Sequence, residues 1–466
     1  MENIRNIAII AHVDHGKTTL VDCLLRQSDT LNRRSMPIER AMDSIDLERE
    51  RGITILSKST AIAWDGVRIN IVDTPGHADF GGEVERVLCM VDSVLLLVDA
   101  VEGPMPQTRF VTQKALEHGL NPIVVINKID RDSARPEWSL DQTFDLFDQL
   151  GATDEQLDFP IVYASALAGF SCLDISSRNH GMAPLLETII KHTPQPKVTL
   201  DGAFQMQITT LDYSPYVGAI GIGRIERGKI ETNSPVALID RKQQIRNVRV
   251  LQVLRSQGLE RVEVPHANAG DIVAVTGIDG LRVSDTLCDP NCVEMLPPLI
   301  VDEPTVTMTF QVNTSPFAGR EGRFLTSRQI GERLQRELIH NVALRVESTG
   351  DPDKFQVSGR GELHLGILIE NMRREGYELA VSRPQVVYKT INNEYCEPHE
   401  VVTVDLAENF QGTIMTLLGQ RRAKLTNIIP DGRGRVRLDY VIPSRGLIGF
   451  RTEFLTATSG TGLLYH

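Results

Sequence analysis

The residues best suited to chemistry stand in one short stretch near the start of the chain. Residues 11–18, Ala-His-Val-Asp-His-Gly-Lys-Thr, match the phosphate-binding pattern G-x-x-x-x-G-K-[ST], except that alanine replaces the first glycine. Gly16 would let backbone N–H groups turn toward phosphate oxygens, the Lys17 ammonium would reach the outer phosphates, and the Thr18 hydroxyl would bind Mg²⁺. On its own, the stretch also fits an ordinary junction between a strand and a helix.

Three more polar stretches follow apolar runs, and they begin at Asp73, Asn127 and Ser165. Apolar runs of this kind are typical of buried parallel strands, whose carboxyl ends form the ligand-binding edge of an open sheet. Asp73 could hold Mg²⁺ through a water molecule, and Gly76 could present an unobstructed N–H to a γ-phosphate. Together with residues 11–18, these positions predict a mostly parallel α/β sheet, with helices on both faces, that binds a nucleotide at one edge.

The stretch Asn127-Lys128-Ile129-Asp130 indicates which base is bound. The Asp130 carboxylate has two acceptors in one plane, which fits the N1–H and N2–H₂ edge of guanine, whereas adenine has no such pair of donors. The small residues after the next apolar run, Ser165-Ala166-Leu167, would let the backbone approach the base closely. The sequence therefore predicts that GTP and GDP are the nucleotides bound.

A long polar stretch, residues 28–51, separates the first predicted helix from Thr54. Such a segment inside a compact domain is usually functional or disordered. Thr54 could give Mg²⁺ a second hydroxyl when a γ-phosphate is present and withdraw it afterwards. Taken alone, Thr54 is better explained as a β-branched residue at the start of a strand.

Composition narrows the class of protein. The net charge of −12 argues against a protein that coats nucleic acid or an anionic membrane non-specifically. The chain has no apolar run of about 18 residues, and its first residues lack the basic end and apolar centre of a signal peptide. The six cysteines are scattered, as is usual in a reducing cytoplasm, and the close pair Cys288 and Cys292 fits a loop with two thiols better than a zinc site. We expect a cytoplasmic monomer that binds neither DNA nor an integral membrane.

Four domains are predicted along the chain. The GTP-binding domain occupies residues 1–196 and ends at a proline-rich linker. Short alternating strands with glycine-marked turns predict a β-barrel domain at 200–296. Strands and amphipathic helices then predict two ferredoxin-like α+β domains, at 303–382 and 396–466.

The last of these domains has a different charge balance from the rest of the chain. From residue 401 to the end, eight basic residues stand against five acidic ones. The basic residues are Arg421, Arg422, Lys424, Arg433, Arg435, Arg437, Arg445 and Arg451. This reversal suggests a surface that faces RNA, and a solvated face explains the charges equally well. No pattern of alternating aromatic and basic residues supports base stacking, so a contact would be to phosphates rather than to bases.

The nucleotide-binding motifs resemble those of the translational GTPases, the family that includes elongation factors G and Tu. The resemblance implies that His77 orients the attacking water, and that Val13 and Ile53 form an apolar gate around it. It implies Mg²⁺ contacts from Thr18, from Thr54 and, through water, from Asp73. It implies nucleotide-binding roles for Asp14, His15, Gly16, Lys17, Thr18, Thr19, Gly76, Asn127, Lys128, Asp130, Ser165, Ala166 and Leu167.

Within this family the chain looks most similar to the BipA/TypA group, through residues 442–451 and 458–462, which lie in a region similar to domain V of elongation factor G. The likeness implies a GTPase switch on the bacterial ribosome, with a role in large-subunit assembly and in stress adaptation of translation. It also implies contacts to both ribosomal subunits and to ribosomal RNA. Members of that group continue into a further C-terminal domain, so a shortened form is expected here.

Three other functions remain open. An elongation-factor-like translocase is disfavoured, because only residues 382–398 lie between the two α+β domains, where such factors carry another domain. A nucleotide-gated scaffold in ribosome biogenesis, in which hydrolysis is incidental, fits the same motifs, and a metabolic phosphotransferase is a more remote alternative. No residue can be assigned as an arginine finger, which predicts slow intrinsic hydrolysis and a partner that accelerates it about 10³–10⁵-fold.

Overall fold

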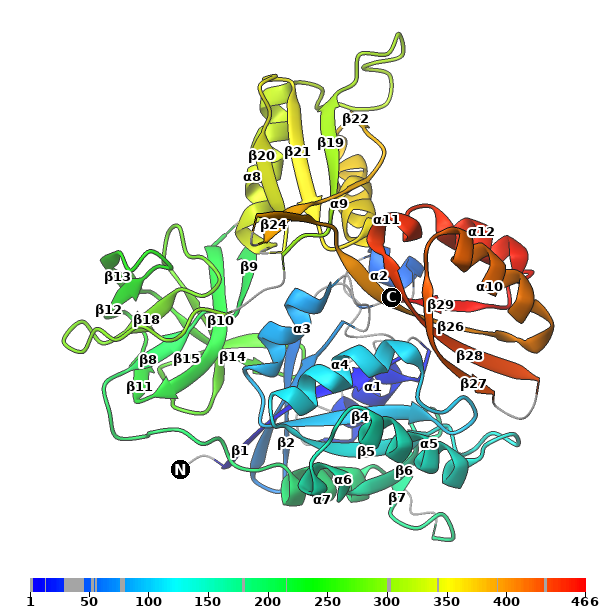
Figure 1. Ribbon diagram of the computed structural model, residues 1–466. Helices are drawn as coiled ribbons and strands as arrows, with labels where there is room; N and C mark the ends of the chain where they lie inside the picture. The colour runs from blue at the N-terminus through cyan, green and yellow to red at the C-terminus, as the bar shows by residue number, and fades with distance from the viewer. Residues whose placement is uncertain are drawn as a thin grey trace. The chain divides into compact units, whose positions relative to one another are not determined.

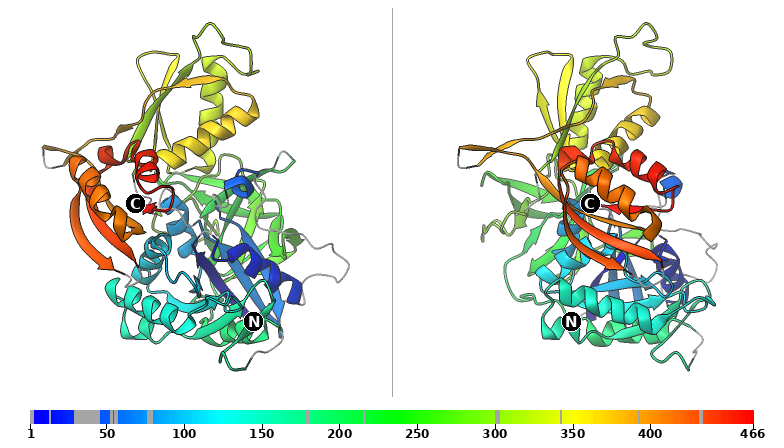
Figure 2. Two further views of the ribbon diagram at one scale, coloured as in Figure 1. Left: turned by 90° about the vertical axis from the view of Figure 1, so that its right-hand side faces the viewer. Right: turned by 45° about the vertical axis from the view of Figure 1, so that its right-hand side comes forward.

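The computed structural model describes residues 3–12, 14–28, 46–51, 54, 57–75, 80–177, 181–214, 216–299, 303–341, 343–391, 393–430 and 434–466. They belong to two compact units, Met1–Ile300 and Val301–His466, and each unit carries two large sheets (Figures 1 and 2). None of the described helices is both long enough and apolar enough to cross a membrane.

The first unit begins with a seven-stranded sheet in the order β2-β3-β1-β4-β5-β6-β7. Its strands are β1 (Asn3–Ala11), β2 (Ser59–Trp64), β3 (Val67–Asp73), β4 (Ser93–Asp99), β5 (Asn121–Asn127), β6 (Ile161–Ser165) and β7 (Phe170–Cys172). The strands from β3 to β6 in this order run parallel, and β2 and β7 pair antiparallel at the two edges. The sequence prediction covers the parallel strands and omits the two edge strands.

Helices cover both faces of this sheet. The helices of this domain are α1 (Lys17–Gln27), α2 (Asp46–Arg51), α3 (Gly81–Leu88), α4 (Pro106–Glu117), α5 (Pro136–Gln149), α6 (Asp154–Leu157) and α7 (Ala183–His192), and all except α2 contribute to the two cores on the sheet. In β1, Ile7 and Ile9 share a core with α1 and α7, whereas Ala8 and Ile10 share the opposite core with α3 and α4. Because neighbouring residues of a strand point to opposite faces, a strand covered on both sides is apolar throughout. The predicted α/β sheet is confirmed.

The second sheet of this unit has nine antiparallel strands, in the order β13-β12-β18-β8-β10-β17-β14-β15, with β9 paired to β10. The strands of this region, including the separate pair β11 and β16, are β8 (Gln205–Gln207), β9 (Thr210–Ser214), β10 (Gly218–Arg227), β11 (Lys229–Glu231), β12 (Ser234–Ile239), β13 (Ile245–Val250), β14 (Val253–Gln257), β15 (Glu260–Val264), β16 (His266–Asn268), β17 (Ile272–Thr276) and β18 (Thr286–Cys288). The close approach of β8 to β10 requires Gly223, because a Cβ there would collide with the Gln207 carbonyl. The predicted β-rich domain is thus present.

Buried polar contacts join the two sheets of the first unit. The Asn70 side chain of β3 donates to the Asp271 carboxylate at 3.1 Å. The N–H of Gly258, in the turn between β14 and β15, donates to the Ala61 carbonyl of β2 at 2.8 Å. The β-rich domain therefore fixes β2, the strand that follows Thr54 in the chain.

The second unit starts with a five-stranded sheet in the order β20-β21-β19-β22, with β23 also paired to β19. Its elements are β19 (Val306–Val312), α8 (Ser327–His340), β20 (Arg345–Ser348), β21 (Lys354–Gly359), α9 (Glu362–Glu375), β22 (Leu379–Val381) and β23 (Gln385–Val386). Ile330 and Leu334 of α8 and Leu365 and Leu368 of α9 pack in one core with the sheet. This is the predicted α+β arrangement, although β23 lies beyond residue 382, where the sequence prediction ends the domain.

A hairpin and a four-stranded sheet complete the second unit. The hairpin is β24 (Lys389–Ile391) with β25 (Glu394–Cys396), and the sheet has the order β27-β28-β26-β29. The elements that follow the hairpin are β26 (His399–Ala407), the 3₁₀ helix η2 (Glu408–Phe410), α10 (Gln411–Gln420), β27 (Lys424–Pro430), β28 (Arg435–Pro443), α11 (Ser444–Leu447), α12 (Phe450–Ala457) and β29 (Leu463–Tyr465). The fully buried rings of Phe450 and Phe454 pack α12 on the sheet together with Ile414 and Leu418 of α10.

Candidate nucleotide-binding site

The candidate phosphate-binding residues form the turn between β1 and α1. Gly16 has a φ of +95°, and a Cβ at this position would lie 2.6 Å from Nδ2 of Asn127, so the turn fits glycine. The helix α1 begins at Lys17, and its first turn receives no side-chain cap. These uncapped N–H groups, at the positive end of the helix dipole, form a site for an anion.

Lys17 lies at the centre of the site. Its Nζ forms an ion pair with Oδ1 of Asp73 at 2.6 Å, and donates to Oγ1 of Thr54 at 2.6 Å and to the Thr74 carbonyl at 2.9 Å. The Thr54 hydroxyl in turn donates to Oδ2 of Asp73 at 3.4 Å. Residues from three segments that the sequence analysis treats separately therefore meet around one ammonium group.

The environment of Asp73 favours a bound cation. Its side chain is buried, with an exposed fraction of 2%. Burial raises the pKa of the Asp73 carboxyl group, and the neighbouring Lys17 acts in the opposite direction. A buried carboxylate is costly unless a cation compensates it. Carboxylate and hydroxyl oxygens suit Mg²⁺, which usually takes one or two carboxylates and completes its shell with water and phosphate, so Asp73 and Thr54 fit this metal.

Asn127, at the end of β5, ties two loops together. Its Nδ2 donates to the His15 carbonyl at 2.8 Å, and its Oδ1 accepts from the N–H of Ala166 at 3.0 Å. Ser165 is fully buried, and its Oγ accepts from the N–H of Ala168 at 3.1 Å. The loop after β1 and the loop after β6 are therefore held in a fixed relation by one amide side chain.

Lys128 is supported by an aspartate that the sequence analysis missed. Lys128 has a φ of +63°, and its Nζ donates to the Asp14 carbonyl and pairs with Oδ2 of Asp99 at 2.7 Å. Asp99 is fully buried at the end of β4, where its other oxygen accepts from the N–H of Val101 at 2.7 Å. The signal that could have identified Asp99 is its position, because it ends an apolar strand as Asp73 does.

Other predicted residues of this edge differ in exposure. Asp130, Leu167 and Thr19 are exposed, and Thr18 is half-buried. The Asp130 carboxylate has no hydrogen-bond partner among the described residues, so its two acceptor oxygens face solvent. A carboxylate in this position can accept hydrogen bonds from a ligand without losing an internal one.

His15 uses its ring and its backbone differently. The ring is fully buried, with Nδ1 at 3.3 Å from the Leu97 carbonyl and Nε2 at 3.6 Å from a carboxylate oxygen of Glu102. The neighbouring His15 ring lowers the pKa of the Glu102 carboxyl group. The ring thus contacts β4 and its following loop, while the His15 carbonyl accepts from Asn127.

Four predicted residues, Val13, Ile53, Gly76 and His77, lie outside the described residues. The γ-phosphate contact of Gly76, the apolar gate and the water-orienting histidine therefore stay predictions.

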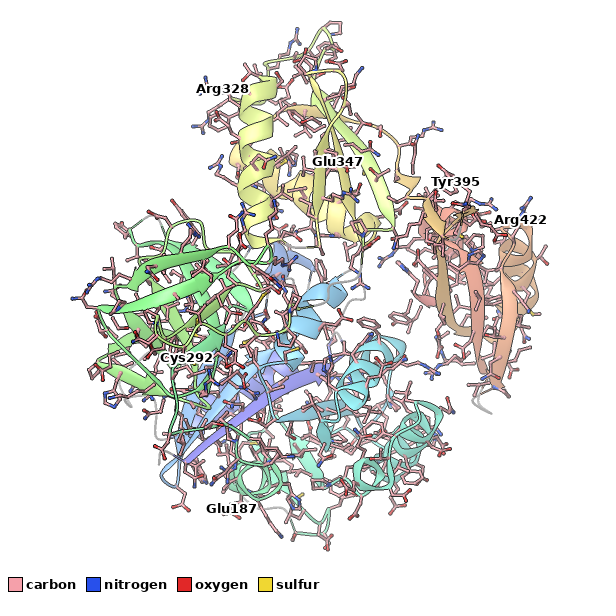
Figure 3. The ribbon with its side chains drawn as sticks, turned by 60° about the vertical axis from the view of Figure 1, so that its left-hand side comes forward. Glu187, Cys292, Arg328, Glu347, Tyr395 and Arg422 are labelled. Atoms are coloured by element: carbon pink, nitrogen blue, oxygen red, sulfur yellow. The ribbon has the colours of Figure 1, made fainter. Side chains whose placement is uncertain are left out.

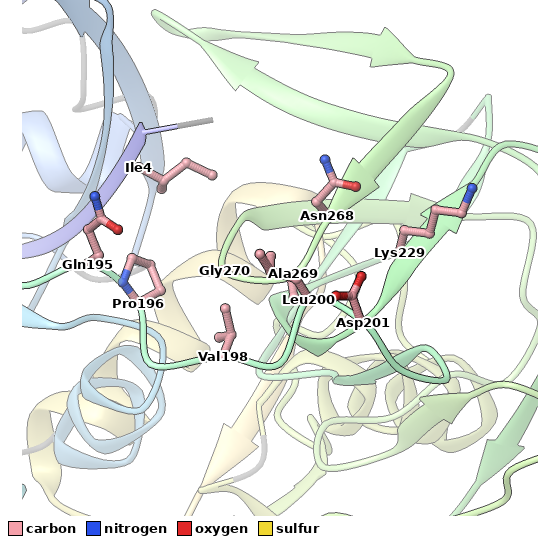
Figure 4. Close-up of a pocket in the computed structure, with 10 residues that line it drawn as sticks. All are labelled: Ile4, Gln195, Pro196, Val198, Leu200, Asp201, Lys229, Asn268, Ala269 and Gly270. Carbon is pink, nitrogen blue, oxygen red and sulfur yellow. The ribbon is translucent and has the colours of Figure 1, made fainter. Parts of the chain in front are cut away.

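A cavity of about 280 Å³ lies elsewhere in the first unit (Figure 4). Its lining combines residues of the linker, such as Gln195 and Pro196, with Lys229 of β11 and Asn268 of β16. No predicted nucleotide-binding residue lines it. This cavity therefore belongs to the junction between the linker and the β-rich domain, and not to the site described above.

Family comparisons match three parts of the chain. The pattern "Elongation factor Tu GTP binding domain" matches residues 2–195, "Elongation factor Tu domain 2" matches 218–288, and "Elongation factor G C-terminus" matches 394–466. The first of these ranges contains all the predicted nucleotide-binding and Mg²⁺-binding residues.

Similar proteins match the chain along its whole length. The large ribosomal subunit assembly factor BipA of Salmonella typhimurium is 66% identical over 465 residues, which span 100% of this chain and 77% of that protein. The proteins of the same name from Haemophilus influenzae and Buchnera aphidicola are 66% and 60% identical, over 100% and 99% of this chain and 76% of each relative. A crystal structure of a protein from Thermus thermophilus has the same fold, with a TM-score of 0.70 at 17% identity, covering 100% of this chain and 96% of that one.

Proposed function

This chain belongs to the BipA family of translational GTPases, and from that premise we propose that it hydrolyses GTP on the ribosome and serves the assembly of the large subunit. Relatives named for large-subunit assembly are similar to it over its whole length. The observation that carries the chemistry is the convergence of Lys17, Thr54 and Asp73 at the strand edge next to the Gly16 turn.

Binding of GTP exchanges partners within this site. In this proposal Lys17 turns from Asp73 to the β- and γ-phosphate oxygens, which carry more negative charge than one carboxylate. The uncapped N–H groups of α1 donate to the same phosphates. Asp14, His15 and Thr19 complete the loop around them.

Thr18, Thr54 and, through water, Asp73 are the residues that would hold Mg²⁺. When bound, the metal neutralises charge on the phosphate oxygens. The Thr54 hydroxyl is already close to Lys17 and Asp73, so it needs little movement to join that set.

Recognition of guanine rests on Asp130. Its exposed carboxylate accepts the N1–H and N2–H₂ donors of the base. Asn127 and Lys128 hold the base-binding and phosphate-binding loops together, and Ser165, Ala166 and Leu167 bring the backbone close to the base. ATP, which lacks the paired donors, would leave Asp130 without its partners.

A change in base specificity tests the role proposed for Asp130. Replacing Asp130 by asparagine turns an acceptor into a donor, which suits XTP, because XTP has a carbonyl oxygen where GTP has the 2-amino group. We expect Asp130→Asn to lose GTP affinity and to gain XTP affinity, each about 100-fold or more. Titration with GTP, XTP and ATP in Mg²⁺ measures it. Equal binding of ATP and GTP by the unaltered protein would overturn the proposed function.

Hydrolysis needs His77, with Gly76 at the γ-phosphate, and it needs the ribosome. His77 orients the attacking water, and the ribosome completes the charge stabilisation that an arginine finger supplies elsewhere, about 10³–10⁵-fold in rate. GTP turnover with and without purified 70S ribosomes measures this. A turnover that ribosomes do not change would contradict the proposal.

A matched pair of variants separates a hydrolytic switch from a scaffold. His77→Ala should abolish ribosome-stimulated turnover and keep GTP affinity, whereas His118→Ala, an exposed histidine at the end of α4, should change neither. If cells depend on the protein and His77→Ala supports them fully, hydrolysis is incidental and binding is the function.

Contact with ribosomal RNA is proposed through the last sheet of the second unit. Ion pairs occupy part of the basic surface predicted there, namely Arg421 with Glu453, Arg435 and Arg437 with Asp405, and Arg445 with Glu397. Arg422, Lys424 and Arg451 are exposed and have no ion pair among the described residues. These three cations are available to phosphates.

The location and the contacts of the protein follow from the ribosome as its proposed partner. We propose that the chain acts as a monomer in the cytoplasm, where it contacts both ribosomal subunits and adapts translation to stress. Four domains, at 1–196, 200–296, 303–382 and 396–466, would share these tasks, with GTP in the first.

A further inference from the structure

The connection between β19 and α8, residues 313–326, is long but built to a fixed shape. Figures 1 and 2 show it projecting beyond the end of the sheet. Most connections inside compact domains are about 4–6 residues long, and longer ordered ones are usually functional. Glu378, directly before β22, organises the loop from inside, because its carboxylate accepts from the Asn313 side chain at 2.6 Å and from the Gly319 N–H at 3.0 Å.

The same carboxylate reaches further along the loop. It also accepts from the N–H groups of Gly322 at 3.1 Å and Glu321 at 3.4 Å. These hydrogen bonds lower the pKa of Glu378, so the group is fully ionised at neutral pH. A Cβ on Gly322 would collide with the Glu378 side chain, so the close approach requires glycine.

The far end of the loop is anchored in the core. The Phe324 ring packs against Tyr377, with ring centroids 4.7 Å apart, and the Phe324 carbonyl accepts from the N–H of Glu378. A loop held at both ends and from inside is pre-organised, and a pre-organised surface binds without a large cost of ordering.

The tip of the loop presents an aromatic ring and positive charge together. Phe317 is 62% exposed, and the Arg320 guanidinium lies 4.8 Å from the centroid of its ring. Arg320 and Arg323 are exposed and have no ion pair among the described residues, and Glu321 is the one acidic residue of the loop sequence. A guanidinium stacked on a ring keeps its N–H edge for a phosphate, and the other face of the ring stays open to a base.

We propose that residues 313–326 dock on RNA, with Arg320 and Arg323 on phosphates and Phe317 stacked on an unpaired base. The proposal rests on the ribosome association proposed above and names a contacting element for it. Phe317 is the single large apolar side chain exposed on this loop, whereas a protein partner usually meets a contiguous apolar patch. In a chain of net charge −12, a local surplus of arginine favours a polyanion.

The test compares full-length variants for binding to 70S ribosomes and to protein-free ribosomal RNA across a range of KCl concentrations. Arg320→Ala should weaken binding about 5–10-fold and reduce the slope of log affinity against log salt by about 1. Phe317→Ala should weaken binding about 5–100-fold with an unchanged slope, because stacking releases no counterion. Glu378→Gln should weaken it about 3–10-fold, because the loop loses its organising charge while both arginines remain.

Arg328→Ala is the matched control. Arg328 is an exposed arginine near the start of α8 (Figure 3), and its pair with Glu332 lies outside the loop. This variant should bind both targets as the unaltered protein does. GTP turnover without ribosomes should be the same in all four variants. Their circular dichroism and thermal unfolding should match those of the unaltered protein, which shows that the second unit, where all four changes lie, is folded.

The outcomes separate the two proposals. If the unaltered protein binds ribosomes and Phe317→Ala and Arg320→Ala bind them equally well, the loop proposal is wrong and the proposed function stands. If these variants lose ribosome binding but bind protein-free RNA normally, the partner is a ribosomal protein and the RNA assignment is wrong. If the unaltered protein binds neither target, both proposals are wrong.

Discussion

Two aspartates of the first unit are buried to the same degree and have different surroundings. Asp73, in the nucleotide site, is 2% exposed, and Asp271, between the two sheets, is 0% exposed. Asp73 forms an ion pair with Lys17, at 2.6 Å. Asp271 faces two arginines, Arg255 at 2.5 Å and Arg68 at 3.6 Å, and also accepts from Asn70.

The two aspartates differ in whether their cationic partner can move to a ligand. Lys17 can move away from Asp73, whereas the two arginines hold Asp271 in place. Lys17 is a point charge on a flexible side chain at the strand edge, and it already divides its donors among Asp73, Thr54 and the Thr74 carbonyl. The two guanidinium groups at Asp271 come from β3 and β14, so their pairing joins two domains. We infer that Asp73 serves ligand exchange and that Asp271 serves cohesion.

The largest effect is expected at Asp271. Replacing Arg68 and Arg255 together by methionine leaves a buried carboxylate without a cation, which should lower the free energy of unfolding of the first unit by about 3–5 kcal/mol. Adding Asp271→Asn should recover most of that loss. Urea denaturation followed by the fluorescence of Trp64 and Trp138, both in the first sheet's domain, measures the change.

The control for this prediction is an exposed pair in the same unit. Arg261 and Asp212 lie 2.8 Å apart with both side chains partly exposed, so Arg261→Met should cost less than about 1 kcal/mol. Equal effects of the two changes would remove the contrast between Asp73 and Asp271.

Asp73→Asn should change ligand affinity and leave stability nearly unchanged, which is the opposite of the effect expected at Asp271. It removes the carboxylate whose pKa burial raises, so the free energy of unfolding should change by less than about 1 kcal/mol. The affinity for GTP in Mg²⁺ should fall about 10–100-fold, because the proposed water-mediated contact to the metal is lost. Titration with GTP, first in Mg²⁺ and then in EDTA, measures the affinity with and without the metal.

The EDTA condition sharpens this prediction. Without Mg²⁺, Asp73→Asn and the unaltered protein should bind GTP with similar affinity. Asp65→Asn, an exposed turn residue with a φ of +48°, should match the unaltered protein in both conditions. A loss of affinity that persists in EDTA would mean that Asp73 does not act through the metal.

A third buried aspartate extends the comparison, because it has no ion pair among the described residues. Asp285 is 1% exposed, and burial raises its pKa from 3.8 to about 6. The native state therefore holds this proton more tightly than the unfolded chain does. The stability contributed by this group is greatest below about pH 4, declines by about 2 kcal/mol as pH rises from 4 to 6, and stays low above that.

Asp285→Asn should remove this part of the pH dependence. The asparagine oxygen can still accept from the Arg282 N–H, which Asp285 now does at 2.8 Å. The melting temperature measured from pH 4 to pH 7 should then lose the corresponding slope. Asp289→Asn, directly after β18, should keep this slope, and a profile unchanged in Asp285→Asn would contradict the assignment.

The smallest effect is expected at Asp99. Asp99→Asn weakens the support of Lys128 and should lower the affinity for GTP and GDP alike by about 10-fold, chiefly through faster dissociation. Stopped-flow displacement of a fluorescent GDP measures the rate. The exposed neighbour Asp132→Asn should have no effect, and equal rates for the two variants would exclude a positioning role for Asp99.

The sequence predicted the first sheet well, because its buried strands depend on local patterns. Apolar runs at β1, β4 and β5 specify buried parallel strands, and the polar residues that end them must then share one edge. The turn at Gly16 was predicted because its conformational need is local. The roles of His77 and Gly76 stay predictions, as do the individual nucleotide contacts.

Other features were not accessible from the sequence. Asp99 was missed, because its partner Lys128 lies on a different strand end. The organisation of residues 313–326 was missed, because Glu378 lies far from this loop in the sequence. Nothing in the residues around Glu378 indicates that its carboxylate accepts four hydrogen bonds from the loop.

The sequence by itself determined the buried parallel strands of the first sheet, the glycine at the phosphate turn and the identity of the chemical groups at the strand ends. Only the tertiary structure decided which of those groups meet, such as Lys17 with Asp73 and Thr54, and which buried charges hold domains together, such as Asp271. The physical reason is the distance along the chain over which each interaction acts. Backbone preference and apolar periodicity act within a few residues, whereas the pairing of buried charges depends on segments that approach each other only after the chain has folded.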